Sequence, residues 1–169
     1  MLRNRGRYQE LFDFQIAKNN LDVLNMLNTK YFIFPDDNSI PRVQLNEEAN
    51  GNAWFVEEVK IVADADQEIM ALDSINTKKT AVVAKDFSNE IGKFVFRKDS
   101  AATIQLKKYK ANELLYESNS AVDQLAVFSE VYYKNGWNAY IDGVPSPHFR
   151  ANYILRAMVV PKGKHEITF

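Results

Sequence analysis

The stretch YYKNGWNAYIDG, Tyr132 to Gly143, decides how the second half of the chain is interpreted. Two tyrosines end an apolar run, a Lys-Asn-Gly turn follows, and Trp137 stands directly behind that turn. A second short run then closes at Asp142-Gly143, a pair typical of a tight hairpin turn. Two interpretations stay open: a hairpin whose tryptophan fills a sandwich core, or an aromatic platform for a sugar ring.

Short strands are expected on both sides of this stretch. From residue 101 onward, runs of five to ten residues are separated by Asn, Gly and Pro turns, and several alternate between apolar and polar residues. The run QLAVFSEVYY is apolar on both faces, which indicates a central strand. This spacing predicts an antiparallel sandwich or barrel.

The first third of the chain has a different pattern. Apolar residues recur close to a 3.6-residue period from Tyr8 to Leu27, with Asn19-Asn20 as a possible break, and predict helix. Short apolar runs at 30–34, 53–62 and 80–84 predict strands, the last of them fully buried. Asp64 and Gln67 have the spacing of a capping box that begins a second helix.

Together these elements predict an α+β class that is mostly β. We expect an antiparallel, jelly-roll-like β-sandwich in a single soluble domain of residues 1–169. Residues 1–30 form a helical lead-in, and 31–169 are mainly sandwich with one further short helix near 64–75. The last residues, GKHEITF, are still in a strand pattern, so we expect the chain to be a piece of a longer protein.

Composition excludes several classes of function. The formal net charge of −1 removes the electrostatic argument for nucleic acid as a partner. Without cysteine there is no disulfide, thiolate zinc site or cysteine nucleophile. No window reaches the ~18 apolar residues of a membrane helix, and the charged N-terminus lacks the apolar core of a signal peptide.

No catalytic residue, metal site or cofactor is predicted. His148 and His165 stand far apart without neighbours at metal-ligand spacing, and no nucleotide-binding or serine-hydrolase motif occurs. Three carboxylates, Glu117, Glu130 and Asp142, fall on or beside neighbouring strands and could in principle form a glycosidase pair. Chance and turn chemistry account for them better, since acidic residues number 22.

Aromatic and arginine side chains are the candidate binding residues. Trp54, Trp137 and Tyr140 could stack on sugar rings, although core packing is favoured for most large aromatics of a sandwich. Arg150 precedes an apolar strand as a possible ligand clamp, and Arg156 lies within that strand. A charge there needs a partner, for which Asp142 or Glu130 is expected, with an edge or solvent-facing arginine as the favoured interpretation.

Four segments in order carry a resemblance that covers about Arg5 to Phe169. They are RYQELFDF…NLDVLNMLNTKYFI, GNAWFVEEVK, LAVFSEVYYKNGWNAYIDG and RANYILRAMVVPKGKHEITF. Together they resemble the C-terminal soluble part of the YfhO-like bacterial membrane protein family, in a Bacteroidetes-type version. Lys134 departs from the proline often found in such hairpins.

The resemblance implies a polytopic membrane protein similar to glycosyltransferases that use lipid-linked sugars. It implies that this domain lies on the extracytoplasmic side of the cell membrane, beside the membrane-embedded part of the same parent chain, and that it carries no catalytic residue. Three functions follow as hypotheses: a glycan-contacting domain, a purely structural or protein-interaction domain, and a self-standing glycan hydrolase.

Overall fold

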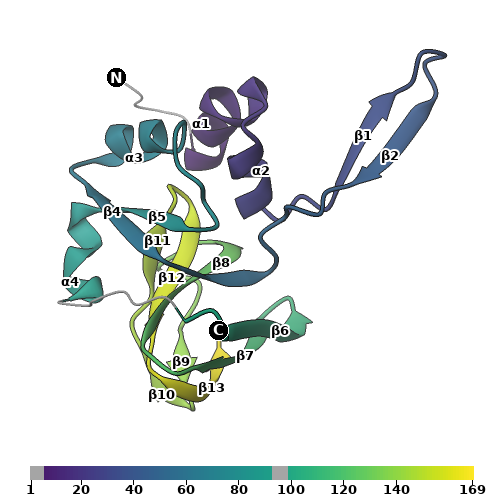
Figure 1. Cartoon of the computed structure of the whole chain (residues 1–169). Helices are drawn as coiled ribbons and strands as arrows, with labels where there is room; N and C mark the ends of the chain where they lie inside the picture. Colours follow the sequence, from purple (N-terminus) through teal and green to yellow (C-terminus); the bar gives the residue numbers. More distant parts are fainter. Residues whose placement is uncertain (1–5, 93–98) are drawn as a thin grey trace.

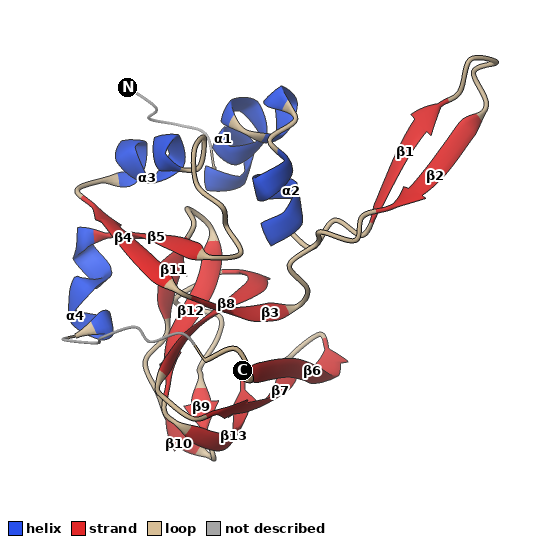
Figure 2. Cartoon of the chain, in the orientation of Figure 1, coloured by secondary structure: helices blue, strands red, loops and turns tan. Residues whose placement is uncertain are grey.

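The computed structural model describes residues 6–92 and 99–169; residues 1–5 of the charged N-terminus and 93–98 lie outside the described ranges. The α+β, mostly β class is confirmed, while the jelly-roll-like connectivity stays a prediction. Figure 2 shows most of the helical structure at one end of the molecule, one short helix beside the sheets, and strands through the remainder. The helices are α1 (Arg7–Phe14), α2 (Leu21–Met26), α3 (Ala65–Ala71) and α4 (Ser88–Ile91), with 3-10 turns at Ile16–Lys18 and Lys85–Phe87.

Two antiparallel sheets form the sandwich. The four-stranded sheet has the order β11 (Phe149–Ala151), β12 (Leu155–Val160), β8 (Gln124–Val131) and β3 (Ala53–Val56). The five-stranded sheet has the order β10 (Val144–Pro145), β9 (Tyr140–Ile141), β13 (Gly163–Thr168), β7 (Glu113–Ser120) and β6 (Thr103–Lys110). Outside both sheets are a parallel pair, β4 (Glu58–Val62) with β5 (Thr80–Ala84), and a hairpin, β1 (Tyr31–Pro35) with β2 (Pro41–Leu45).

The four-stranded sheet is buried on both of its faces. Along β8, Leu125 and Val127 pack in a core with the helices, whereas Ala126 and Phe128 pack in a second core with the five-stranded sheet. This follows from the period of two in a strand, which sends alternate side chains to opposite faces. Figure 1 shows the resulting layers: helices above, the four-stranded sheet in the middle and the five-stranded sheet below. The prediction that the run QLAVFSEVYY forms a central strand is confirmed for Gln124–Val131, while the two tyrosines lie beyond the end of β8.

The N-terminal helical portion is shorter and more broken than the periodicity predicts. Asn19 has a left-handed backbone with φ of 57°, and the Asn20 side chain caps α2 by accepting a hydrogen bond from Val23 N. Asparagine tolerates both roles at low cost, so the pair separates the helical segments. Leu11, Val23 and Met26 are fully buried against the sandwich side of the molecule.

The segment predicted as one strand over 53–62 is two strands in different sheets. Ala53–Val56 is β3 in the four-stranded sheet, and Glu58–Val62 is β4, paired in parallel with β5. Between β4 and β5 runs α3, capped by Asp64, whose carboxylate accepts from Gln67 N at 2.9 Å. These three elements form a βαβ unit beside the antiparallel sandwich, and the sequence analysis did not predict this parallel pair.

Helical structure also extends further than expected. Besides α3, which ends at Ala71 and not near residue 75, the chain forms a 3-10 turn and α4 after β5. The short helix predicted near 64–75 is therefore present as α3, whereas α4 was not predicted. None of the helices in the described ranges has the length and apolar character that crossing a bilayer demands.

Candidate binding site around Trp137

The stretch 132–143 connects the two sheets instead of forming a single hairpin. β8 ends at Val131 in the four-stranded sheet, while β9 begins at Tyr140 and pairs with β13 and β10 in the five-stranded sheet. The true hairpin turn is the later one between β9 and β10, where Asp142 and Gly143 have φ of 51° and 77°. A type I′ turn needs positive φ at both central residues, which explains the Asp-Gly pair.

Position 136 requires glycine because the Tyr133 ring leaves no room for a side chain, and not because of the backbone angle φ. A glycine in a tight turn is commonly expected to have a positive φ, but Gly136 is not among the residues with positive φ. A Cβ built at Gly136 would lie 2.2 Å from Cδ1 of Tyr133, whose ring covers this turn. Because Gly136 has no side chain, the backbone can turn tightly under the Tyr133 ring. This turn directs the chain so that Trp137 lies at the end of the sandwich.

Trp137 is half-buried and lies on a buried arginine. Its ring packs against the core between the two sheets. Cζ of Arg156 lies 4.3 Å from the Trp137 ring centroid and 5.1 Å from that of Phe169, so the guanidinium contacts both rings. Such cation–π contacts strengthen when the cation is desolvated, and Arg156 is only 2% exposed. The contact with Arg156 on its buried side therefore fixes the orientation of the Trp137 ring.

Two open pockets meet at Trp137. One has a volume of about 440 Å³ and the other about 390 Å³, and both are lined by Trp137, Asn138 and Tyr140. The larger pocket is also lined by aromatic and polar side chains, namely Phe87, Glu90, Tyr132, Lys134, Ser146 and His148. Tyr140 is half-buried on β9, next to Ile141, which packs in the core. The structure thus brings two of the four predicted binding residues, Trp137 and Tyr140, to one place.

Arg156 lacks the ion pair that the sequence led us to expect. No carboxylate among the described residues lies within salt-bridge distance of it, and its Nε donates to the Val131 carbonyl at 3.1 Å. Burial lowers the pKa of Arg156, against the opposing charge of Glu130. Burial also raises the pKa of Glu130, which Arg156 counteracts. The interpretation as an edge or solvent-facing arginine is wrong, because Arg156 projects between the sheets.

A β-bulge places Glu130 at this end of the sandwich. Leu155 and Arg156 are adjacent on β12, yet they oppose Val131 and Phe128 on β8, so Ser129 and Glu130 are extra residues. Bulges re-aim side chains and are over-represented beside functional sites. Here the bulge lets Arg156 reach the Val131 carbonyl.

Three buried polar atoms at this end have no hydrogen-bond partner in the described part of the chain. They are Oη of Tyr116, Nε2 of His148 and Nη1 of Arg156. The Phe169 ring contacts all three side chains, with centroid distances of 6.1 Å to Tyr116 and 5.7 Å to His148. Buried polar groups are normally paired, so this concentration marks the region as unusual. Burial in this region lowers the pKa of His148, and the positive charge of Arg156 lowers it further.

Trp54 lies elsewhere and is part of the core. It is 6% exposed, and its indole Nε1 donates to the Thr77 carbonyl at 3.0 Å. Thr77 is itself fully buried, accepts a hydrogen bond from Asn50 Nδ2 and donates through Oγ1 to the Asp22 carbonyl. This arrangement ties β3 to α2 and to the loop after α3, which is a structural role.

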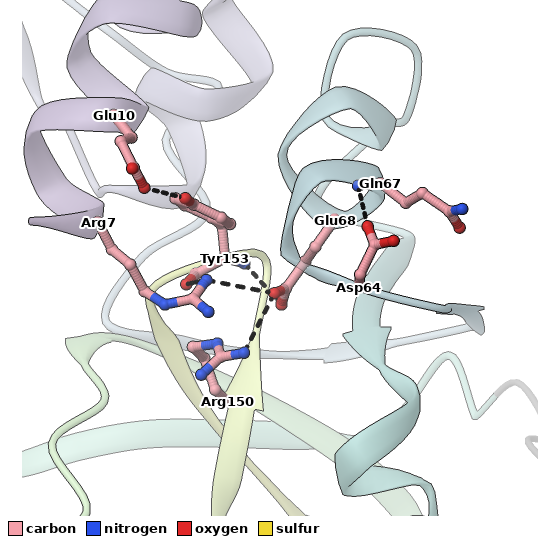
Figure 3. A network of polar contacts seen from close by, with 7 residues as sticks. All are labelled: Arg7, Glu10, Asp64, Gln67, Glu68, Arg150 and Tyr153. Atoms are coloured by element: carbon pink, nitrogen blue, oxygen red, sulfur yellow. Dashed lines mark hydrogen bonds and ion pairs between the residues drawn. The ribbon is translucent and has the colours of Figure 1, made fainter. Parts of the chain in front are cut away.

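Arg150 belongs to a buried polar network between the helices and the sandwich (Figure 3). Its Nη2 lies 3.4 Å from Oε2 of Glu68, a carboxylate with no exposed surface, and Arg7 approaches the same oxygen at 3.6 Å. Tyr153 N donates to Oε1 of Glu68 at 3.0 Å, and the Tyr153 hydroxyl contacts Glu10. Burial raises the pKa of Glu68, against Arg150, the Tyr153 N–H and Arg7. Sequence reasoning missed this network, since its members are scattered over α1, α3, β11 and the turn after β11.

Arg150 also reaches the site indirectly. Its Cζ lies 5.1 Å from the ring centroid of Phe87, which lines the larger pocket. The Arg150 guanidinium thus contacts the Phe87 ring and also donates to Glu68. Arg150 therefore positions a residue of the pocket without lining the pocket itself.

The three carboxylates considered as a hydrolytic pair are engaged separately. Glu117 lies 3.3 Å from Lys107 on the exposed face of the five-stranded sheet. Asp142 lies 2.6 Å from Nδ1 of His165, a contact that lowers the pKa of Asp142. Glu130 is half-buried in the bulge of β8, and the nearby charge of Arg156 acts on it. Among residues 6–92 and 99–169, no three acidic or histidine side chains cluster as a metal ion would require.

Comparison with known proteins gives no relative: no family model matches the chain, and neither a curated protein nor a solved structure is similar to it.

Proposed function

We propose that this chain is a non-catalytic, extracytoplasmic domain of a polytopic, glycosyltransferase-like membrane protein, and that it contacts a glycan or acceptor through the pockets around Trp137. The resemblance of four ordered segments to the YfhO-like family supports the membrane context. One observation supports the ligand: a half-exposed tryptophan, held by a buried arginine, stands where two open pockets meet.

The chemistry of this site suits a sugar. A pyranose presents C–H groups on its faces and hydroxyl groups at its rim, so it stacks on an aromatic ring and hydrogen-bonds around it. Trp137 and Tyr140 supply the rings, and Asn138, Ser146 and Lys134 supply donors and acceptors on the pocket walls. A ring that is already fixed loses little conformational entropy on binding, which favours affinity.

Non-catalytic binding fits the acidic side chains better than hydrolysis does. A glycosidase needs two carboxyl groups ~5 to ~9 Å apart across a cleft. Glu130 is half-buried in the bulge of β8 and interacts with the charge of Arg156, whereas Glu117 and Asp142 are occupied on the surface by Lys107 and His165. A hydrolase would therefore have to use groups outside this set.

A purely structural or protein-interaction domain is the second candidate. Two of the four predicted binding residues favour it, because Trp54 and Arg150 are engaged inside the fold. This candidate predicts no sugar binding at all, so one set of titrations separates the two.

The test is calorimetric titration of the 169-residue chain with a panel of mono- and oligosaccharides. Tyr140→Ala should lower the affinity for a bound sugar by more than ~10-fold, the equivalent of ~1.4 kcal/mol. Trp137→Phe, which keeps a ring over Arg156, should lower it less. Tyr8→Ala is the control, because it removes a tyrosine on α1 that is 60% exposed and lines neither pocket. Circular dichroism checks folding, and binding unaffected by Tyr140→Ala would place the sugar elsewhere.

The membrane context has its own test. A tagged parent chain should fractionate with membranes, and protease added to the outside of spheroplasts should cleave this domain. Protection of the domain in intact spheroplasts would contradict the extracytoplasmic location. This result is independent of whether the pockets bind sugar.

A further inference from the structure

The β1–β2 hairpin extends away from the body of the molecule, as Figures 1 and 2 both show. Its register pairs Tyr31 with Leu45, Ile33 with Val43 and Pro35 with Pro41. Alternate residues of a strand share a face, so these three pairs lie on one face of the hairpin. That face is wholly apolar, and Tyr31, Ile33, Val43 and Leu45 are between 55% and 71% exposed.

Specific polar contacts hold the hairpin in a defined conformation at both of its ends. At its tip, Oδ1 of Asp36 accepts hydrogen bonds from Asn38 N and Ile40 N, and Oδ2 forms an ion pair with Arg42 at 2.8 Å. At its base, Nδ2 of Asn46 donates to the Asn25 side chain and to the Thr29 carbonyl, both at 2.8 Å. Both ends are therefore fixed by specific polar contacts.

An uncovered apolar face of this kind is costly in water. A two-stranded hairpin is marginally stable alone and needs a further layer against its apolar face. Exposed apolar patches of this sort mark interaction surfaces in folded proteins. We propose that the apolar face of the β1–β2 hairpin is covered by the same face of a second copy of this chain, in a two-fold symmetric dimer.

The area fits such a dimer. With roughly 100 Å² left in water on each of six apolar side chains, one hairpin offers about 600 Å². Two hairpins face to face would then bury about 1,200 Å², the lower limit for specific protein interfaces. A face made only of apolar side chains is also complementary to itself, as an isologous contact requires.

Charge favours a second copy over a lipid surface. The tip of the hairpin carries Asp36 and Asp37, and its single cation, Arg42, is neutralised by Asp36. Nothing in the hairpin attracts anionic lipid, and inserting the tip into a bilayer would bury carboxylates. Between two hairpins the acidic tips can stay in water. The dimer does not depend on the proposed glycan contact.

Analytical ultracentrifugation of the 169-residue chain over a concentration series tests the dimer. Wild type should show a reversible monomer–dimer equilibrium. Val43→Glu, in the middle of the apolar face, should weaken association by more than ~10-fold, because like charges are then opposed in a desolvated contact. Gln44→Glu introduces the same charge on the adjacent residue and opposite face, and it should leave association within ~2-fold of wild type.

Cross-linking provides an independent readout, since the chain has no cysteine. Under mild oxidation, Val43→Cys should form disulfide-linked dimers, and Gln44→Cys should not. A monomer at every concentration would overturn the proposal, and so would equal effects of Val43→Glu and Gln44→Glu. Flotation of a monomeric chain with phosphatidylcholine or phosphatidylglycerol vesicles, abolished by Val43→Glu, would assign the face to lipid instead.

Discussion

Replacing Gly136 with alanine should destabilise the protein only while Tyr133 is present. The alanine Cβ would lie 2.2 Å from Cδ1 and 2.6 Å from Cε1 of the Tyr133 ring. Carbon atoms in contact are normally ~3.5 to ~4.0 Å apart, so the ring must move by more than ~1 Å. Tyr133 is 60% exposed, which lets its side chain swing toward solvent.

The magnitude follows from these contacts. Overpacking costs ~1 to ~3 kcal/mol, and an exposed ring that can move places Gly136→Ala at the lower end, about 1 kcal/mol. In a Tyr133→Ala background the obstacle is gone and the sign should reverse. Alanine then stabilises by ~0.4 to ~1 kcal/mol, because it restricts the unfolded chain more than glycine does. The expected coupling energy is therefore ~1.5 to ~2 kcal/mol.

Urea unfolding of the wild type, both single variants and the double variant measures this coupling. The m-value should stay constant across the four proteins, so that the midpoints report free energy alone. If Gly136→Ala costs the same with and without Tyr133, the contact with that ring is not the reason for the glycine. A large loss in both backgrounds would point instead to a backbone angle that alanine cannot adopt.

Three further predictions concern named contacts. Trp54→Phe removes the donor to the Thr77 carbonyl and should lower the free energy of unfolding by ~1 to ~3 kcal/mol, while calorimetry shows unchanged sugar binding; lost binding in a folded variant would contradict the structural role. His165 donates from both nitrogens to Asp142 and to the Lys162 carbonyl only when protonated, so its pKa is raised. This stabilisation is complete below the unfolded pKa of ~6.5 and is lost as the pH rises through the folded pKa. Asp142→Asn keeps an Asn-Gly turn but removes the carboxylate that His165 contacts. The difference in melting temperature between wild type and Asp142→Asn should therefore become smaller as the pH rises through the folded pKa of His165. A difference that does not change with pH would refute the contribution of the protonated His165. In Arg156→Met, the Glu130 pKa measured by NMR titration should rise, because the opposing charge is gone, and an unchanged value would mean that Arg156 does not act on it.

Local patterns predicted most of the strands, helices and turns, but not how the strands pair. The Asn19-Asn20 break, the Asp64 cap and the buried strand at 80–84 each depend on neighbouring residues, and all three are present. The division of 53–62 into β3 and β4 depends on which sheet each half joins. A fully buried strand that follows a capped helix is typical of a parallel βαβ unit, but this local pattern does not identify the strand with which it pairs.

The candidate site was only partly readable from sequence for a related reason. Trp137 and Tyr140 are close in the chain, but strand alternation predicts that they lie on opposite faces. They line the same pockets because residues 132–139 form no strand. Arg156 reaches Trp137 only because a bulge in β8 and the crossing between sheets bring them together. Composition likewise cannot show that Trp54 is buried by contacts with Thr77, 23 residues away.

The sheet formed by β11, β12, β8 and β3 separates two hydrophobic interiors and belongs to both. Neither the helical layer nor the five-stranded sheet can unfold alone, because the loss of either would expose one apolar face of the shared sheet to water. Heating should consequently produce one calorimetric transition, and a fragment lacking the helices should aggregate instead of persisting as a smaller folded body.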